Sequence, residues 1–280
     1  MAKRTEPTAR QARLAVELRR LREAAGLASR EAAALLEVTA PQISQIESGL
    51  AGVSEKRLRR LAANYSCHDE SLIDALVAMA TDRTRGWWEQ YRTLLPAPFL
   101  DLAELEHHAT FLREAQFLYV PGLLQTEDYA RAVFRYRVPE LPDDDLDLRV
   151  QHRMQRKAAR ETTPYEVVVH EAALRIMVCD RAAWRVQLAD ILEVSEACHV
   201  TVRVIPFAVE GFAGAASAMM HAGGAVPKLD TVVRDAPNGA VYIDSEAQLS
   251  DLRSLFRRVR ATALTPERSR DLIHRVAKEL

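Results

Sequence analysis

The sequence predicts two domains: an all-α domain at the N-terminus and, after it, an α/β domain with a mixed sheet. Three observations support this division. A chain of 280 residues is longer than a typical domain and suggests roughly two. Residues 1–65 carry 12 Lys and Arg against 7 Asp and Glu, whereas the rest carries 26 against 32. Strand signals begin only at residue 165, and the first part has helical periodicity. We expect the domains to span residues 1–82 and 86–280.

The first predicted helix combines an apolar stripe with charged residues. The stripe, at helical spacing, consists of Leu14, Leu18, Leu21 and Ala25. The residues that fall away from it, and are expected in solvent, are Arg13, Glu17, Arg20 and Glu23. Gly26 is expected to end this helix.

Two short helices follow, for which Ser29 and Thr39 are the expected N-caps. Pro41 is tolerated in the first turn of the second of them, where its missing N–H would have no intrahelical partner. On a helical wheel, the apolar residues Ile43, Ile46 and Leu50 point to one side together with Thr39. The other side is polar but uncharged, and it carries Pro41, Ser44, Gln45 and Ser48, with Gln42 at its flank.

A fourth helix, capped by Ser54, is expected to carry much of the positive charge of this domain. Its cations are Lys56, Arg57, Arg59 and Arg60. A fifth, apolar helix is expected over residues 72–80. A small basic module beside a larger acidic one is typical of a nucleic-acid reader, because neutralised phosphates supply affinity that does not depend on sequence. A solvated helical face would give the same charge count, so the charge count alone does not distinguish a nucleic-acid reader from such a face.

Two short helices joined by a tight turn form the helix-turn-helix arrangement, which places a recognition helix in the major groove. The segment GLASREAAALLEVTAPQISQIESG, residues 26–49, resembles the helix-turn-helix of Cro- and Xre-type repressors over roughly sixty residues. The resemblance implies a structural ion pair between Arg22 and Glu47. Loss of one partner of such a buried pair costs about 3–5 kcal/mol. The sequence departs from the family pattern at Ala28, Ser29 and Glu37, which stand where the family has a threonine cap, a glutamine and a turn glycine.

Base reading and phosphate binding are expected on different elements of this domain. Gln42 and Gln45 can pair through their amides with adenine or reach a phosphate, and Ala40 and Pro41 can touch a thymine methyl group. The other residues assigned to the DNA-binding surface are Ser29, Thr39 and Ser44. The phosphates are expected to be held by Arg19, Lys56, Arg57 and Arg60. The expected partner is a double-stranded DNA operator, and a purely structural helical bundle is the alternative.

The second domain starts with the aromatic junction WWEQYRTLLPAPF at residues 87–99. Helices are expected at residues 100–108, 127–135 and 143–157, and strands at residues 165–170, 200–207, 217–222, 231–235 and 240–244. A helix within residues 180–195 separates the first two strands and predicts a right-handed parallel crossover. The last three strands predict an antiparallel meander. Two helices, at residues 246–261 and after the cap Thr265, close the chain.

No pattern in the second domain predicts catalysis. His170 and Glu171 lack the second histidine of a zinc-protease helix, and the adjacent His107 and His108 diverge on a helix. The three cysteines form no CxxC motif, so neither a zinc site nor a disulfide framework is expected. We therefore expect no enzyme, no catalytic residue, no metal and no cofactor. The sequence contains neither a long apolar run nor a signal-peptide pattern, which predicts a cytoplasmic protein without a membrane span.

The segments RGWWEQYRTLLP, YVPGLLQTEDYARAVF and VTVRVIPF resemble the C-terminal domain that follows the helix-turn-helix in a large group of actinobacterial regulators. In that group the domain is similar to an antitoxin-like module and is often paired with a small neighbour-encoded protein. The resemblance implies partner binding. Trp87, Trp88 and Tyr91 would suit a partner hot spot, or equally a clamp between the two domains. A homodimer is expected, because two half-sites one turn apart need a two-fold axis.

The leading hypothesis is therefore a DNA-binding transcriptional regulator, an autoregulatory and antitoxin-like repressor that binds a small protein. An alternative makes the second domain a small-molecule sensor that controls the repressor, which would need a pocket. A third hypothesis, an enzyme fused to a DNA reader, would need an acid-base or nucleophile pair that the sequence does not display.

Overall fold

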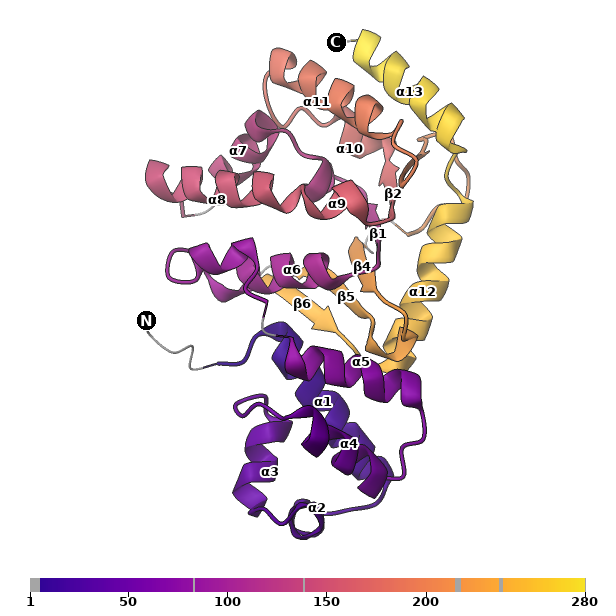
Figure 1. Cartoon of the computed structure of the whole chain (residues 1–280). Helices are drawn as coiled ribbons and strands as arrows, with labels where there is room; N and C mark the ends of the chain where they lie inside the picture. Colours follow the sequence, from indigo (N-terminus) through magenta and orange to yellow (C-terminus); the bar gives the residue numbers. More distant parts are fainter. Residues whose placement is uncertain (1–5, 83, 138, 215–217, 237–238, 280) are drawn as a thin grey trace. The chain divides into compact units, whose positions relative to one another are not determined.

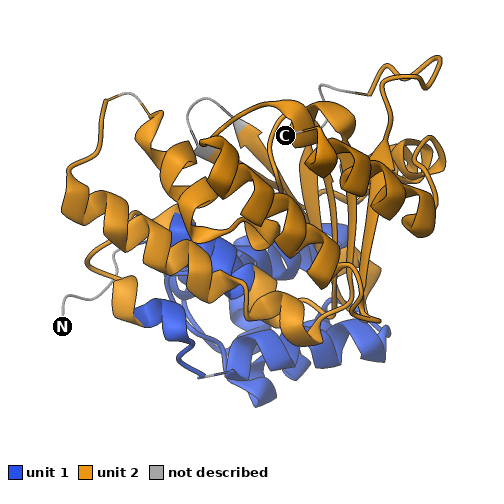
Figure 2. Ribbon diagram, turned by 90° about the horizontal axis from the view of Figure 1, so that it is seen from above, with its two compact units in different colours: residues 1–89, 99–105 blue, residues 90–98, 106–280 orange. Residues whose placement is uncertain are grey.

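The computed structural model describes residues 6–82, 84–137, 139–214, 218–236 and 239–279. The chain forms two compact units (Figure 2). Unit 1 comprises Met1–Glu89 and Phe99–Leu105, and unit 2 comprises Gln90–Pro98 and Glu106–Leu280. None of the helices in the described ranges has the length and apolar character needed to cross a membrane.

Unit 1 is built from short helices around a small apolar core. The helices are α1 (Ala9–Ala24), α2 (Ser29–Leu36), α3 (Ala40–Glu47), α4 (Glu55–Asn64) and α5 (Glu70–Thr81), followed by the 3-10 helix η1 (Trp87–Tyr91) (Figure 1). The core includes Leu18, Ile43, Leu58, Leu61 and Leu76, each at most 2% exposed. The predicted helical character of this part is confirmed.

Side-chain caps fix the starts of these helices. Thr39 and Ser54 cap α3 and α4, as predicted. Thr8 caps α1 in a capping box with Gln11, in which each residue bonds the backbone N–H of the other. The cap of α2 is Ala28 rather than Ser29. Alanine has no side-chain acceptor, so only the Glu31 half of a capping box forms, with the Ala28 N–H donating to the Glu31 carboxylate.

Two expectations about burial in unit 1 are wrong. Arg13 and Glu17 were expected in solvent but are each only 6% exposed, and their side chains form an ion pair with each other. Mutual neutralisation allows both charges to leave water. Leu50 was expected to face the core but is 61% exposed, because α3 ends at Glu47 and the chain leaves the helical path before it.

Unit 2 contains a mixed sheet, as predicted, but the sheet has six strands rather than the five expected. Its strands are β1 (Phe111–Gln116), β2 (Tyr165–His170), β3 (Val200–Ile205), β4 (Met219–Gly223), β5 (Thr231–Ala236) and β6 (Gly239–Ile243), in the order β3-β2-β1-β4-β5-β6. β1, β2 and β3 pair in parallel, and β1, β4, β5 and β6 pair antiparallel in that order. The predicted parallel crossover and meander are both confirmed. Residue 217, where the third strand was expected to start, lies outside the described residues.

The central strand β1 was not predicted. Its sequence, FLREAQ, contains Arg113, Glu114 and Gln116 and lacks the β-branched run of β2 and β3. It is held by pairing with β2 on one side and β4 on the other. Its inner position depends on those two neighbours, which no local pattern can reveal.

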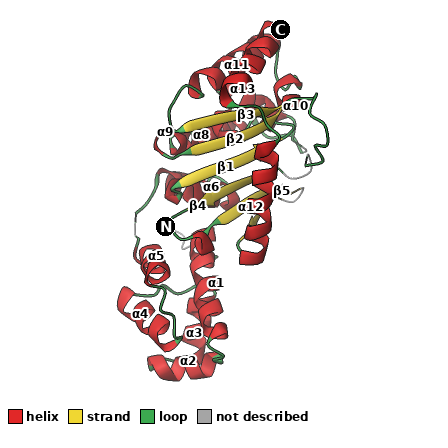
Figure 3. Ribbon diagram, turned by 90° about the vertical axis from the view of Figure 1, so that its right-hand side faces the viewer, coloured by secondary structure: helices red, strands yellow, loops and turns green. Residues whose placement is uncertain are grey.

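Helices cover both faces of the sheet (Figures 1 and 3). The helices of unit 2 are α7 (Glu127–Arg135), α8 (Asp143–Arg156), α9 (Ala159–Thr162), α10 (Glu171–Arg175), α11 (Arg181–Val194), α12 (Glu246–Ala261) and α13 (Pro266–Lys278), with the 3-10 helices η2 (Gly122–Leu124) and η3 (Pro227–Leu229). A further helix, α6 (Ala97–His108), is divided between the units, with residues 99–105 in unit 1. α12 lies on one side of the strands, where Leu249, Phe256 and Val259 enter the core, and α7, α8 and α9 lie on the other. The crossover helix α11 buries Trp184, Leu188 and Ile191, as its predicted stripe requires.

The junction aromatics are largely internal. Trp88 and Tyr91 are 3% and 4% exposed, and Trp87 is partly buried. The ring of Tyr91 meets the ring of His152 edge to face, with centroids 5.0 Å apart. This burial favours the packing role of Trp88 and Tyr91 over a role as a partner hot spot.

Candidate nucleic-acid interface

The turn between α2 and α3 contains a left-handed residue. Glu37 ends α2 with φ 57° and ψ 41°, in the region that favours glycine and costs a side-chain-bearing residue about 1–2 kcal/mol. Arg60 of α4 donates to the Glu37 carboxylate at 2.8 Å and to the Leu35 carbonyl at 2.7 Å. The contacts of Arg60 therefore help to hold the turn in this conformation.

The start of α3 is closed by a full capping box. The Thr39 hydroxyl accepts from the Gln42 N–H at 3.4 Å, and the Gln42 side-chain oxygen accepts from the Thr39 N–H at 2.9 Å. The amide oxygen of Gln42 is thereby engaged within its own helix. Its amino group remains available to a DNA acceptor.

The outer face of α3 is exposed and uncharged. Ile43 and Ile46 are 1% and 4% exposed and anchor the helix to the core, while its outer residues Pro41, Gln42, Ser44 and Gln45 are exposed. Thr39 is exposed as well, and Ala40 and Ser29 are half-buried. Within the described ranges, the side chain of Gln45 has no hydrogen-bond partner, so its amide can pair with a base edge without breaking an internal contact.

An ion pair ties α3 to α1. Arg22 donates from Nε to Glu47 Oε1 at 2.7 Å and from Nη2 to Oε2 at 2.9 Å, and its Nη1 donates to the Leu27 carbonyl at 2.7 Å. Both side chains are under 10% exposed. The hydrogen bond with Glu47 raises the pKa of Arg22. This bidentate pair fixes the C-terminal end of α3.

The cations around α3 differ in their freedom to bind phosphate. Lys56 and Arg57, at the exposed start of α4, have no ion-pair partner within the described ranges. Arg19 pairs with Glu23 at 2.7 Å, in solvent. Arg60 is exposed, but its guanidinium is already paired with Glu37 in the turn between α2 and α3. The structure adds Arg30, an exposed arginine in the first turn of α2, on the helix that crosses the DNA backbone in this motif.

His170 and Glu171 of unit 2, which begin a zinc-protease-like pattern in the sequence, both form hydrogen bonds within the protein. His170 caps α10 through its Nδ1, which accepts from the Ala172 N–H. Glu171 accepts from Arg175 and from the Phe207 N–H. Among the residues that the structure describes, no group of His, Cys, Asp and Glu side chains could hold a metal ion.

A second group of charged and polar side chains in unit 2 is buried. Arg156 forms a bidentate pair with Glu106, and the Tyr165 hydroxyl donates to Glu114 on β1. Burial raises the pKa of Glu114 to about 7. Glu106 and Tyr165 are 0% and 1% exposed, so both side chains are buried inside unit 2.

Two family models match the chain. A model described as "Helix-turn-helix domain" matches residues 13–76, which contain α2 and α3. A model described as "Domain of unknown function (DUF5753)" matches residues 99–275, more than half of the chain. No curated protein and no solved structure gives a significant match.

Proposed function

The chain belongs to the DUF5753 family and carries a helix-turn-helix domain that makes it a DNA-binding regulator, and from this premise we propose that it represses its own gene. In this proposal α3 enters the major groove and reads bases through Gln42 and Gln45, while Lys56, Arg57 and Arg30 hold phosphates. The observation that carries it is the exposed, uncharged outer face of α3, on a domain whose exposed Arg30, Lys56 and Arg57 have no ion-pair partner within the described ranges. Such a face reads hydrogen-bonding patterns and leaves affinity to the cations around it.

The test is a fluorescence anisotropy titration with a duplex from the region upstream of the gene. We expect saturable binding whose affinity falls with salt by about 0.9 log unit per log unit for each neutralised phosphate. Replacing Gln45 by Ala should reduce discrimination against a scrambled duplex by about 1–3 kcal/mol. The matched control is Gln151→Ala on the exposed face of α8, which should leave discrimination unchanged. Salt-independent binding, or none, would reject DNA recognition.

The proposal also includes a small protein partner for unit 2 and an antitoxin-like role. Its support is the resemblance of the segments RGWWEQYRTLLP and YVPGLLQTEDYARAVF to the antitoxin-like domain of actinobacterial regulators. Copurification from the native host, with the neighbouring gene intact, is the direct measurement. A stoichiometric small polypeptide supports this role, and a ligand-dependent thermal shift without such a polypeptide points instead to a small-molecule sensor. The proposal assigns no catalytic step to unit 2.

A further inference from the structure

A polar strip crosses the face of the sheet that α12 covers. Arg113 on β1 is the register partner of Glu166 on β2, and Glu166 is the partner of Thr201 on β3. Arg203, two residues after Thr201, projects from the same face. Farther along the strands, this face is apolar and packs against α12. The strip therefore lies beside the helix on an otherwise apolar face.

Three arginines of this strip converge on one carboxylate. Arg260, near the end of α12, places its Nε 2.5 Å from Glu166 Oε1. Arg203 Nε lies 3.7 Å from the same oxygen, and Arg113 Nε lies 3.8 Å from Oε2. We call Arg113, Arg203 and Arg260 the arginine triad. Its three positive charges face one negative charge, which leaves an excess of two.

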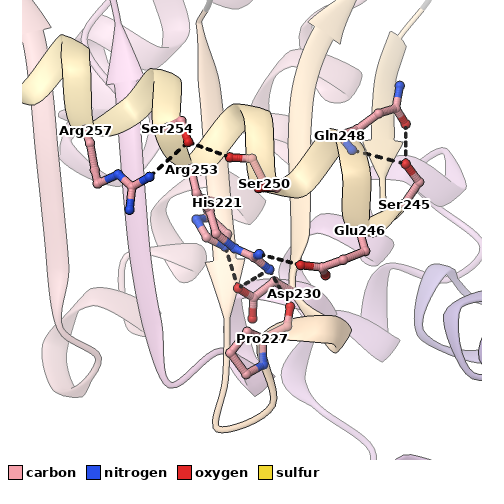
Figure 4. Close-up of polar contacts among 10 residues, drawn as sticks. All are labelled: His221, Pro227, Asp230, Ser245, Glu246, Gln248, Ser250, Arg253, Ser254 and Arg257. Carbon is pink, nitrogen blue, oxygen red and sulfur yellow. Dashed lines mark hydrogen bonds and ion pairs between the residues drawn. The ribbon is translucent and has the colours of Figure 1, made fainter.

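Another arginine on α12 shows how the chain neutralises a guanidinium in this region (Figure 4). Arg253 contacts Asp230 at 3.3 Å and Glu246 at 3.0 Å, and Asp230 also bonds the buried His221. Arg253 thus has two carboxylates nearby, whereas the whole triad shares Glu166. Glu267 is within electrostatic reach of Arg203, but it lies in solvent, where screening weakens the interaction.

The triad is open to solvent and contains an unsatisfied donor. The side chains of Arg113 and Arg260 are 44% and 50% exposed, and those of Glu166 and Arg203 are each 20% exposed. The Arg203 Nε–H is buried and, within the described part of the chain, has no hydrogen-bond acceptor. Glu166 Oε1, 3.7 Å from this Nε atom, also lacks a hydrogen-bond partner among the described residues, and so does the Nε–H of Arg253. The excess positive charge of the triad, rather than this single N–H, therefore favours an anionic ligand.

We propose that the arginine triad binds a phosphate monoester. Guanidinium groups match phosphate oxygens with paired N–H donors, and three of them balance Glu166 together with a dianion. The ring of Phe111, with its centroid 4.7 Å from Arg113 Cζ, helps to orient one guanidinium. The site joins three parallel strands to α12. It goes beyond the proposed function and does not depend on DNA binding.

Isothermal titration calorimetry of the full chain at pH 8, where a monoester is a dianion, tests this site. Inorganic phosphate and phenyl phosphate are the probes, and diethyl phosphate, a diester monoanion like the nucleic-acid backbone, is the comparison, all at matched ionic strength. Both dianions should bind at one site and the diester more weakly. Arg113→Gln and Arg260→Gln should each weaken binding on the order of tenfold. The control Arg135→Gln, exposed at the end of α7, should change nothing.

The Glu166→Gln variant tests whether the bound anion competes with the Glu166 carboxylate for the arginine triad. If a dianion shares the triad with Glu166, removal of the carboxylate charge should tighten phosphate binding on the order of tenfold. Circular dichroism of each variant shows whether it is folded, and the exposed Arg113 and Arg260 give variants that should retain the fold. Absence of saturable binding, equal weakening by Arg135→Gln, or weaker binding by folded Glu166→Gln would overturn the proposal. Equal affinity for the diester would also overturn it, since that result describes a general nucleic-acid surface.

Discussion

At the scale of single residues, two buried carboxylates differ in the charge of their hydrogen-bond partners. Glu47 has a bidentate arginine partner in unit 1, Arg22. Glu114 accepts from Tyr165 and Gln116, both neutral, and its pKa rises to about 7 because burial disfavours its charge. Glu47 is therefore held by a charged partner, whereas Glu114 is held by neutral ones.

Replacing Glu47 by Gln should destabilise unit 1 by about 3–5 kcal/mol, because the buried Arg22 loses its bidentate partner and keeps only the more distant Glu23 carboxylate, 3.7 Å away. Chemical denaturation followed by circular dichroism measures the loss. Glu55→Gln is the matched control, since Glu55 is about half exposed and its pair with Arg59 should contribute less than about 1 kcal/mol. Similar losses in the two variants would show that the Arg22 pair does not stabilise unit 1 more than a surface pair.

Glu114 should make the stability of unit 2 depend on pH. Its pKa is raised from 4.5 to about 7 in the folded state, so the folded state holds the proton more tightly. This contribution is fully present below pH 4.5 and is lost as pH rises through about 7. The free energy of unfolding of the wild type, relative to Glu114→Gln, should fall by about 3 kcal/mol across this window.

The comparison with Glu114→Gln is needed because His152 acts in the opposite direction. Burial lowers the pKa of His152 from 6.5 to about 3, so its contribution is lost as pH falls through that range. Urea denaturation of both proteins at several pH values gives the difference, from which His152 cancels. Glu196→Gln, at an exposed position, is the control. A wild-type-minus-variant difference that stays flat between pH 4 and pH 8 would contradict the prediction.

At the scale of elements, the helix-turn-helix depends on its turn and caps. The turn residue Glu37 has a left-handed backbone conformation. Arg60 forms an ion pair with the Glu37 carboxylate. The capping box of Thr39 and Gln42 then fixes where α3 begins. The chain thus uses a glutamate and a bridging arginine where a glycine would remove the strain.

Glu37→Gly should stabilise unit 1 by about 1 kcal/mol, because glycine adopts a positive φ without steric cost. The exposed ion pair with Arg60 contributes little, so its loss should not reverse the sign. Glu37→Ala is the control: it removes the same ion pair but keeps the strained backbone, and it should be neutral or slightly destabilising. Thermal unfolding of the wild type and the two variants measures these differences in stability. Equal stability of the glycine and alanine variants would show that the turn is not strained.

At the scale of the whole molecule, the two units carry different groups of charged and polar residues. Unit 1 carries the exposed face of α3 and the cations around it, and unit 2 carries the sheet, the buried carboxylates and the arginine triad. A single small reader covers too few bases for tight specific binding, so we propose that the protein binds its operator as a two-fold homodimer.

A homodimer on its operator should protect two half-sites whose centres are about 10 base pairs, or a multiple of one helical turn, apart. Hydroxyl-radical footprinting measures the spacing, and analytical ultracentrifugation of the free protein measures its oligomeric state. One protected patch together with a monomeric protein would contradict the two-fold assembly.

Much of the fold was predictable because its signals are local. Thr39, Ser54 and Thr265 mark helix starts by chemistry that acts within one turn, and the β-branched runs of β2 and β3 indicate strands directly. The outer face of α3 follows from the spacing of Ile43 and Ile46. For these features the neighbouring residues in the chain carry the information.

Other features were decided only by tertiary structure. β1 is a strand because β2 and β4 pair with it on both sides, although its own residues are mostly polar. Arg13 and Glu17 are buried because each neutralises the other, and the arginine triad exists because two parallel strands and α12 bring its three members to Glu166. The amino-acid sequence by itself determined most of the helices, the caps Thr39, Ser54 and Thr265, and the exposed face of α3, since short-range sterics and hydrogen bonds set them. Strand order and charge clusters depend on contacts between distant residues, which form only when the chain has packed.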